Sequence, residues 1–362
     1  MRNKVLVAGA SGVVGAAAVE AFLREGWEVV ALSRRAPEIA GSQAFTHLAV
    51  DLQDAAASRA ALGALTGVTH LVYTALFEKP GLIAGWQEQD QMNTNLAMLK
   101  NCLEPLEAAG NPLQHVSLLQ GTKAYGIHLH PMPIPARERN PRDPHANFYW
   151  LQEDYLKERA AAAGFAWTIL RPQLIIGSAY GVAMNLAPVI GAYGAICREL
   201  GEPMGYPGGI SWVWEAVDAR LLANVFVWAG TSPQASGLHF NVTNGDVFEW
   251  RDVWPVMADT LGVATGPDTP RELKHWLPEH EAVWDRLVAR HGLRKVALPA
   301  LLGESHHYAD FCFAYGMTTP PPAAFVSTIR LRQAGFHEVC DTQDMFTYWL
   351  KDFIQRGILP KA

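Results

Sequence analysis

A glycine-rich segment directly after the first predicted strand constrains the fold of this chain more than any other feature. Residues 9–15 read Gly-Ala-Ser-Gly-Val-Val-Gly, follow the apolar run Val5–Ala8 and open a predicted helix over Val13–Glu25. Glycines here let the backbone approach a pyrophosphate, and the helix N-terminus offers unpaired N–H groups and a positive dipole end. The pattern predicts a dinucleotide site, the alternative being a turn that only packs helix against strand. The expected contacts are Gly9, Ser11, Gly12, Val13, Val14 and Gly15.

Short apolar runs alternate with helix-length segments through the first 180 residues. Strands that alternate with helices form βαβ units and a parallel sheet. The expected fold class is therefore α/β, with a Rossmann-type doubly wound parallel sheet. The predicted strands are Val5–Ala8, Glu28–Leu32, Leu48–Val50, His70–Tyr73, Gln114–Leu119 and Trp167–Leu170, and the clearest helices are Val13–Glu25, Gln89–Ala109 and Phe148–Ala163.

The texture of the sequence changes after Gly177, where a second lobe is expected to begin. Glycine and proline are frequent at 201–209, which predicts a loop. Residues 212–229 regain helical periodicity, and 237–242 predict a last strand that returns to the sheet. Helices predicted at 250–261, 279–291 and 344–356 are expected to cover a substrate cleft. The predicted domains are a dinucleotide-binding domain at 1–177 plus about 212–245, and a smaller, mostly helical substrate lobe at 178–211 and 246–362.

Composition excludes several classes of function. The formal net charge is −6 without a long basic run, so the footprint of a nucleic-acid-binding protein is missing. The four cysteines are scattered and form no C-x-x-C pair, which argues against a disulfide framework or a zinc site. The basic start Met1–Lys4 resembles a signal peptide only until the glycine pattern interrupts it. We expect a cytoplasmic protein without a membrane span or a metal, whose partner is a small molecule.

The end of the second predicted strand bears on the choice of cofactor. Enzymes that use NAD usually place an acid there to bind the ribose 2′-hydroxyl, but this chain has Ser33, Arg34 and Arg35. Two guanidinium groups can pair with a 2′-phosphate, which favours NADPH, although solvated arginines are the alternative. After the third strand, Asp51 and Leu52 are expected at the adenine edge, unless Asp51 is merely exposed. Thr74, Ala75, Gln120, Pro172 and Ile175 are further expected cofactor contacts.

The catalytic pattern common in short-chain dehydrogenase/reductases, Y-x-x-x-K on one helix, is missing. Tyr149 is followed four residues later by Glu153, and Tyr155 by Arg159. Either the chain is not catalytic or a cation comes from elsewhere. Lys123, just after the fifth predicted strand, is the candidate.

Two motifs identify a resemblance to the progesterone 5β-reductase and iridoid synthase family, atypical extended short-chain dehydrogenase/reductases that act on enones. Residues 120–125 (QGTKAY) resemble the family's loop that bears a catalytic lysine, and residues 147–154 (NFYWLQED) resemble its tyrosine motif. The similarity continues through 171–177, 207–208, 240–250 and 357–360, and so covers nearly the whole chain. The resemblance implies that Lys123 and Tyr149 are catalytic and also contact the cofactor.

The implied reaction is hydride transfer from NADPH to the β-carbon of an α,β-unsaturated carbonyl. Tyr149 would hydrogen-bond the oxygen on which enolate charge develops, and Lys123 would lower the pKa of the phenol. Reduction of a ketone or aldehyde by the same residues stays open, as does a non-catalytic NADP-sensing protein. A sugar-nucleotide epimerase or dehydratase would normally retain Y-x-x-x-K.

Departures from the family bear on the substrate. Plant members usually have histidine after the lysine and a second tyrosine after the catalytic one, whereas this chain has Ala124 and Trp150, and residues 127–133 also differ. A reshaped pocket is therefore expected, with Tyr180, Met184 and Trp150 contacting a small hydrophobic carbonyl substrate. Asn95 is either a structural residue or an exposed one, His128 and His130 are expected at the surface, and a homodimer stays open.

Overall fold

The computed structural model describes residues 3–41, 43–80 and 82–362, without the side chains of 82–84. Met1 and Arg2 of the basic N-terminus therefore lie outside the described residues. The chain divides into two compact units. Unit 1 comprises Met1–Gln173, Ala219–Thr243 and Val326–Glu338, and unit 2 comprises Leu174–Asp218, Asn244–Phe325 and Val339–Ala362.

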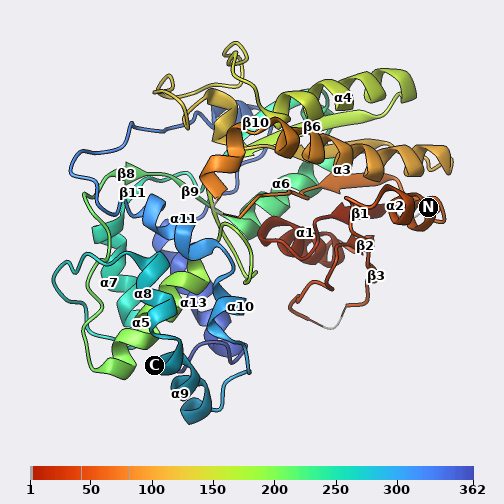
Figure 1. Cartoon of the computed structure of the whole chain (residues 1–362). Coiled ribbons are helices and arrows are strands. Elements are labelled where there is room, and N and C mark those ends of the chain that lie inside the picture. Colours follow the sequence, from red (N-terminus) through yellow and green to blue (C-terminus); the bar gives the residue numbers. More distant parts are fainter. Residues whose placement is uncertain (1–2, 42, 81) are drawn as a thin grey trace. The chain divides into compact units, whose positions relative to one another are not determined.

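Unit 1 is built on a seven-stranded parallel sheet (Figure 1). Its order is β10-β6-β5-β4-β1-β2-β3, and the register aligns Ala8 of β1 with Leu32 of β2 on one side and Tyr73 of β4 on the other. The strand order reverses between β1 and β4, which is where dinucleotides bind in such sheets. The strands are β1 Lys4–Ala8, β2 Glu28–Leu32, β3 Thr46–Leu48, β4 His70–Tyr73, β5 His115–Leu119, β6 Ala166–Pro172 and β10 Leu238–Val242.

Helices cover both faces of this sheet. Helices α1 (Val13–Arg24) and α6 (Ala219–Thr231) pack against each other on one face. Helices α2 (Ala55–Leu62), α3 (Gln89–Ala108) and α4 (Phe148–Ala163) cover the other, where the main apolar core forms. The core residues of the strands include Leu6, Leu71, Val116 and Ile169, which meet Leu99, Leu103 and Leu156 of the helices. Burial on both faces explains why these strands are continuously apolar.

Unit 2 is mostly helical and carries two small two-stranded sheets. Its strands are β7 Leu174–Ile176, β8 Val213–Trp214, β9 Ala216–Asp218 and β11 Phe248–Glu249. Its helices are α5 Leu186–Leu200, α7 Trp250–Thr260, α8 Leu273–Glu279, α9 Glu281–His291, α10 Leu298–Leu302, α11 Ser305–Cys312 and α13 Thr342–Gln355. The short 3-10 helices η1 (Leu82–Gln87), η2 (Thr122–Tyr125) and η3 (Pro233–Ala235) and the helix α12 (Ile329–Gln333) belong to unit 1.

Several sequence-based boundaries were wrong. The third strand is Thr46–Leu48 rather than 48–50, because its pairing with β2 begins at Thr46. The helix predicted from 212 begins at Ala219, since residues 213–218 form β8 and β9. Residues 326–338 were expected in the second lobe but belong to unit 1, where Val326 bridges Ala136 and Ser327 O accepts a hydrogen bond from Asn241 Nδ2.

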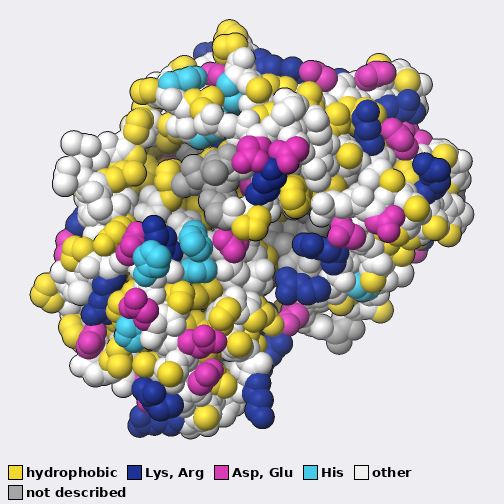
Figure 2. Space-filling model, in the orientation of Figure 1, with side chains coloured by type: hydrophobic (Ala, Val, Ile, Leu, Met, Phe, Trp, Pro, Cys, Tyr) yellow, Lys and Arg dark blue, Asp and Glu magenta, His cyan; other side chains and the backbone are white. Residues whose placement is uncertain are grey.

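Charged side chains of both signs are interspersed on the face that Figure 2 displays. Among the helices described, none has the length and apolar character needed to cross a bilayer.

Candidate active site

The loop between β1 and α1 makes a tight turn against two neighbouring strands. Gly9 has a φ of +83°, a conformation that suits glycine, and a Cβ there would lie 2.7 Å from the backbone nitrogen of Ala75. The N–H groups of Gly9 and Ala10 donate to Leu32 O at 2.9 and 3.1 Å. The turn is therefore fixed to the ends of β2 and β4, and it admits no side chain at position 9.

Helix α1 begins at this loop without a side-chain cap, since Gly12 occupies the N-cap position. The first N–H groups of a helix have no partner within the helix, so they remain suited to an anion. A Cβ on Gly15 would lie 2.7 Å from the carbonyl carbon of Gly9 and 2.8 Å from Ala10 Cα, so the helix and loop touch backbone to backbone. Ser11, Gly12 and Val13 keep partial exposure, whereas Val14 is buried. This glycine cradle fits a dinucleotide pyrophosphate.

The ends of β2 and β3 hold the residues predicted for the adenosine end of a cofactor. Ser33 Oγ donates to Arg35 O at 2.6 Å and shapes the bend that exposes the side chains of Arg34 and Arg35. Within the described residues, neither guanidinium makes an ion pair, so both are available to an external anion. Asp51 Oδ1 accepts from Gln53 N at 3.0 Å, and Leu52 is buried in the core. These two residues therefore also have structural roles at the start of α2.

Other predicted cofactor residues lie in different surroundings. Thr74 N and Oγ1 both donate to Ala8 O, so Thr74 and Ala75 continue β4 beside the glycine loop. The amide of Gln120 is engaged by protein groups: Arg171 Nε donates to its Oε1 at 2.9 Å, and its Nε2 donates to Glu153. Pro172 ends β6 in unit 1, whereas Ile175 lies on β7 of unit 2.

Tyr149 lies in the first turn of α4. Asn147 caps this helix by accepting a hydrogen bond from Tyr149 N at 3.0 Å. A Cβ built on Gly121 would lie 3.1 Å from the Tyr149 hydroxyl, so the phenol rests over the loop that follows β5. Burial, together with the negative charge of Glu78, raises the pKa of the phenol, and Arg171 opposes this effect. The net pKa lies above that of an ordinary phenol, because burial outweighs the charge of Arg171. The expectation that Lys123 lowers this pKa stays a prediction.

Lys123 lies on η2, two residues beyond Gly121. Its ammonium nitrogen is 3.9 Å from Glu78 Oε1 and 3.2 Å from the centre of the Trp86 ring. Burial lowers the pKa of Lys123 below its ordinary value, and the charge of Glu78 works in the opposite direction. The ammonium thus sits in a poorly solvated position between one carboxylate and one aromatic face.

Glu78 is a site residue that the motif analysis missed. Its side chain is 6% exposed, and its pKa is raised by burial, against the opposing charge of Lys123. It lies near both candidate catalytic groups, since its charge acts on Tyr149 as well as on Lys123. The charge of Glu78 therefore acts on both candidate catalytic groups, beyond the carboxyl ends of β4 and β5. The only signal in the sequence was the position of Glu78 shortly after the fourth strand.

Glu153 occupies the position where Y-x-x-x-K would place lysine, and it has a different function. Its carboxylate is 2.6 Å from Lys157 Nζ and 3.1 Å from His239 Nε2. Arg142 and Arg171 lie at 3.2 and 3.5 Å. Burial opposes ionisation, but the close approach of His239 and the hydrogen bonds from Lys157 and Gln120 hold the pKa of Glu153 well below its usual range. Glu153 is therefore the ionised centre of a buried network on the inner side of α4.

The remaining candidates of unit 1 have packing contacts. Trp150 is 8% exposed, its Nε1 donates to His145 O at 3.0 Å, and Arg142 lies over its ring, so contact with a substrate would require the indole to be uncovered. Asn95 is fully buried. His130 Nε2 is 3.0 Å from Asp143. Among the described residues, no group of three or more His, Cys, Asp or Glu side chains is arranged to hold a metal ion.

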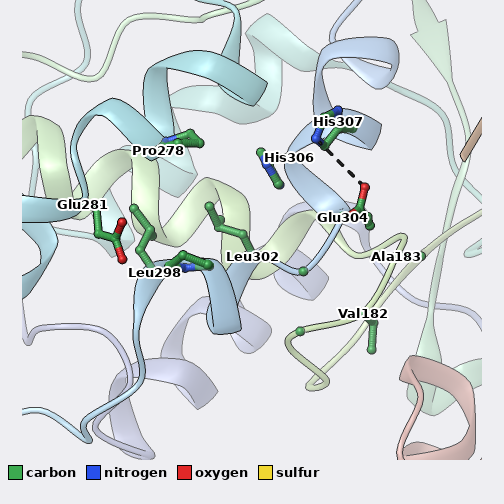
Figure 3. A pocket seen from close by; sticks show the side chains of 12 residues that line it. Val182, Ala183, Pro278, Glu281, Leu298, Leu302, Glu304, His306 and His307 are labelled. Atoms are coloured by element: carbon green, nitrogen blue, oxygen red, sulfur yellow. Dashed lines mark ion pairs between the residues drawn. The ribbon is translucent and has the colours of Figure 1, made fainter. Parts of the chain in front are cut away.

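The residues predicted to contact substrate in the second lobe flank a cavity of unit 2, shown in Figure 3. Its volume is about 470 Å³, and residues 181–183, between Tyr180 and Met184, form one wall. Gly181 N donates to Leu301 O at 2.9 Å and fixes that wall to α10. Burial lowers the pKa of His306 to about 4, so this imidazole is neutral. The lining residues are Gly181, Val182, Ala183, Pro278, Glu281, Leu298, Pro299, Leu302, Gly303, Glu304, His306 and His307.

Solved structures show the same fold. A UDP-glucose 4-epimerase of Thermus thermophilus in complex with NAD matches with a TM-score of 0.66 at 19% identity, over 97% of this chain and 98% of that one. A Bordetella bronchiseptica enzyme in complex with NAD⁺ matches with a TM-score of 0.65 at 15% identity, over 99% and 100%.

Sequence comparison gives the family. An (S)-8-oxocitronellyl enol synthase of Antirrhinum majus is 30% identical, over 81% of this chain and 78% of its own. One of Nepeta racemosa is 31% identical, over 81% and 77%. A short chain dehydrogenase of Penicillium aethiopicum is 29% identical over the whole of both chains. Residues 39–314 match the family described as the PRISE-like Rossmann-fold domain. The chain therefore belongs to the PRISE-like family, as the lysine and tyrosine motifs indicated, and it is an oxidoreductase of the short-chain dehydrogenase/reductase type.

Proposed function

We propose that this protein uses NADPH to reduce the carbon–carbon double bond of a small, hydrophobic α,β-unsaturated carbonyl compound. The observation that supports the proposal is that the Tyr149 hydroxyl lies over Gly121, two residues before Lys123, in the loop that follows β5 at the carboxyl end of the sheet. The enol synthase names of the Antirrhinum and Nepeta relatives support the reaction class.

The cofactor part of the proposal rests on the glycine cradle and on the two exposed arginines. The cradle has no room for a Cβ at Gly9 or Gly15, which suits close approach of a pyrophosphate to the backbone. Arg34 and Arg35 lie at the end of β2, where guanidinium groups can pair with a 2′-phosphate. Bound NADPH would supply the hydride, and these residues would determine its orientation and its selection over NADH.

The protein groups would act on the substrate oxygen. When a hydride reaches the β-carbon, the π electrons of the double bond shift toward the carbonyl, and negative charge develops on its oxygen. The neutral phenol of Tyr149 donates a hydrogen bond to that oxygen, and the ammonium of Lys123 stabilises the same charge electrostatically. A proton from solvent at the α-carbon then completes the reduction. The raised pKa of Tyr149 favours its role as a donor that stays protonated.

The test is to measure NADPH oxidation against matched cyclic enones, enals and saturated ketones, and to identify the products. The proposal predicts saturated carbonyl products from enones and enals, with little turnover of ketones. Allylic or saturated alcohols would instead show carbonyl reduction, with Tyr149 protonating an alkoxide. Tight NADPH binding without turnover of any compound would contradict an enzymatic role and favour a nucleotide sensor.

A further inference from the structure

The loop after β4 presents one carboxylate to the candidate active site, and helix α3 holds that loop through two buried amides. Asn95 Oδ1 accepts from Phe77 N at 2.9 Å, and its Nδ2 donates to Phe77 O at 2.9 Å. One helical turn earlier, Gln91 Oε1 accepts from Lys79 N at 3.0 Å, and its Nε2 donates to Glu78 Oε2 at 2.8 Å. Helix α3 therefore holds the backbone of the residues before and after Glu78, and Gln91 also holds the Glu78 carboxylate.

This anchoring leaves the other carboxylate oxygen directed at Lys123. Because Gln91 occupies Oε2, the ammonium faces Oε1 at 3.9 Å. The side chains of Glu78 and Lys123 are 6% and 19% exposed, so water compensates little of either charge. The Trp86 ring covers another side of the ammonium, and the Lys123 nitrogen lies 3.2 Å from the centre of that ring. A buried ammonium in such surroundings needs a fixed anion to remain charged.

We propose that Glu78 is a positioning residue that holds the Lys123 ammonium in place and keeps it charged for catalysis. This inference rests on the proposed function, in which Lys123 acts as a cation. Among the described residues, Glu78 is the carboxylate with which Lys123 forms an ion pair. The nearby Lys79 is already engaged by Glu88 and Asp90, and so does not compete for Glu78.

The other charged and titratable groups around this cluster come from several elements. The charges of Glu78 and of Arg171, on β6, both act on Tyr149 of α4. His128 lies beyond Trp86, with ring centres 6.3 Å apart, and burial, His145 and Lys123 lower its pKa to about 4. Asp143 contacts both His145 and His130, so these three residues interact with one another. His128 is neutral at the pH of an assay, so the charges that matter are those of Glu78, Lys123 and Arg171.

The sign of the pH effect follows from these neighbours. Burial lowers the pKa of Lys123, and the negative charge of Glu78 offsets part of that effect by raising it. For Tyr149, burial and the charge of Glu78 both raise the pKa. Both groups must be protonated in the proposed reaction. Removing the charge of Glu78 lowers the pKa values of both Lys123 and Tyr149. On raising the pH, the variant should therefore lose activity at a lower pH than the wild type does. A nearby opposite charge shifts a pKa by about 1–3 units, so Glu78→Gln should move the alkaline limb down by about one unit or more.

The test compares Glu78→Gln and Glu78→Asp with Glu88→Gln, a matched change at an exposed acid of the same region. The kcat/KM of NADPH-dependent reduction is measured from pH 6 to 10, with the enone that the wild type reduces fastest. We expect the alkaline limb to move to lower pH in Glu78→Gln, to move less in Glu78→Asp, and to stay in place in Glu88→Gln. An equal loss of activity at every pH in Glu78→Gln would reduce Glu78 to a structural residue and overturn the proposal.

A second readout needs neither cofactor nor turnover. Competitive acetylation with trace acetic anhydride, read by peptide mass spectrometry, gives the pH at which the Lys123 amine becomes reactive. That midpoint should fall in Glu78→Gln and stay unchanged in Glu88→Gln; an unchanged midpoint in Glu78→Gln overturns the inference. If the wild type reduces no substrate, the proposed function fails while this measurement still decides the role of Glu78. Glu78→Asp keeps the carboxylate and serves if Glu78→Gln does not fold.

Discussion

Replacing Gly15 with alanine should destabilise unit 1 even though alanine favours helices. Gly15 lies in α1, where the change gains about 0.5–1 kcal/mol of helix propensity. The new Cβ would lie 2.7 Å from the carbonyl carbon of Gly9 and 2.8 Å from Ala10 Cα, well inside the roughly 3.5–4.0 Å of an ordinary carbon contact. Both neighbours are backbone atoms that no rotamer change can move. Overpacking of this kind costs about 3 kcal/mol at the upper end, which leaves a net loss of about 2 kcal/mol.

Gly12→Ala is the matched control for this substitution. Its Cβ would meet a single atom within 4 Å, Gly9 O at 3.2 Å, and its φ of −83° and ψ of 173° suit alanine. We expect the melting temperature of the cofactor-free protein, followed by circular dichroism, to fall by roughly 4–8 °C in Gly15→Ala and by about 1 °C in Gly12→Ala. NADPH titrations should nevertheless show weakened binding in both, because position 12 is expected at the pyrophosphate. A Gly15→Ala protein as stable as the wild type would refute the packing argument.

Three further outcomes are expected. Tyr149→Phe should lower kcat by about 100-fold or more while NADPH affinity changes little, because one hydrogen-bond donor to the developing charge is lost; wild-type turnover would exclude the phenol as the main donor. Arg34→Ala with Arg35→Ala should weaken NADPH binding by about 10–100-fold and NADH binding hardly at all, with the exposed Arg59→Ala as control; equal losses would exclude a phosphate contact. Burial lowers the pKa of His115 to about 3, so the unfolded chain takes up the proton first, and stability should fall as the pH drops below 6.5. Between pH 7 and pH 5 this group alone should remove about 2 kcal/mol in urea unfolding; a slope unchanged in His115→Gln would contradict it.

The sequence predicted the sheet well because its strands are buried on both faces. Continuous apolar runs such as His70–Tyr73 match β4 completely, and Glu28–Leu32 matches β2. The pattern misled where burial does not follow strand pairing. Val50 is buried although β3 already ends at Leu48, so the apolar run pointed two residues too far. Before α6, residues 213–218 form two short strands that resemble a helix start when the local periodicity alone is considered.

The candidate catalytic pair could be proposed from the sequence because each member lies in a compact motif, whereas Glu78 has none. Its role depends on Gln91 and Asn95, which hold the loop from a helix that begins more than ten residues later. The raised pKa of Tyr149 has a similar origin, since the effect of burial on a phenol cannot be read from nearby residues in the sequence. Long-range contacts determine both properties.

The most direct test of the central claim is a crystal structure with bound NADP⁺, in which the distances from the nicotinamide and its ribose to Tyr149 Oη and Lys123 Nζ are measured. The account predicts that both atoms lie beside the nicotinamide, with at least one within about 3 Å of a ribose hydroxyl. A nicotinamide bound away from both side chains would contradict it.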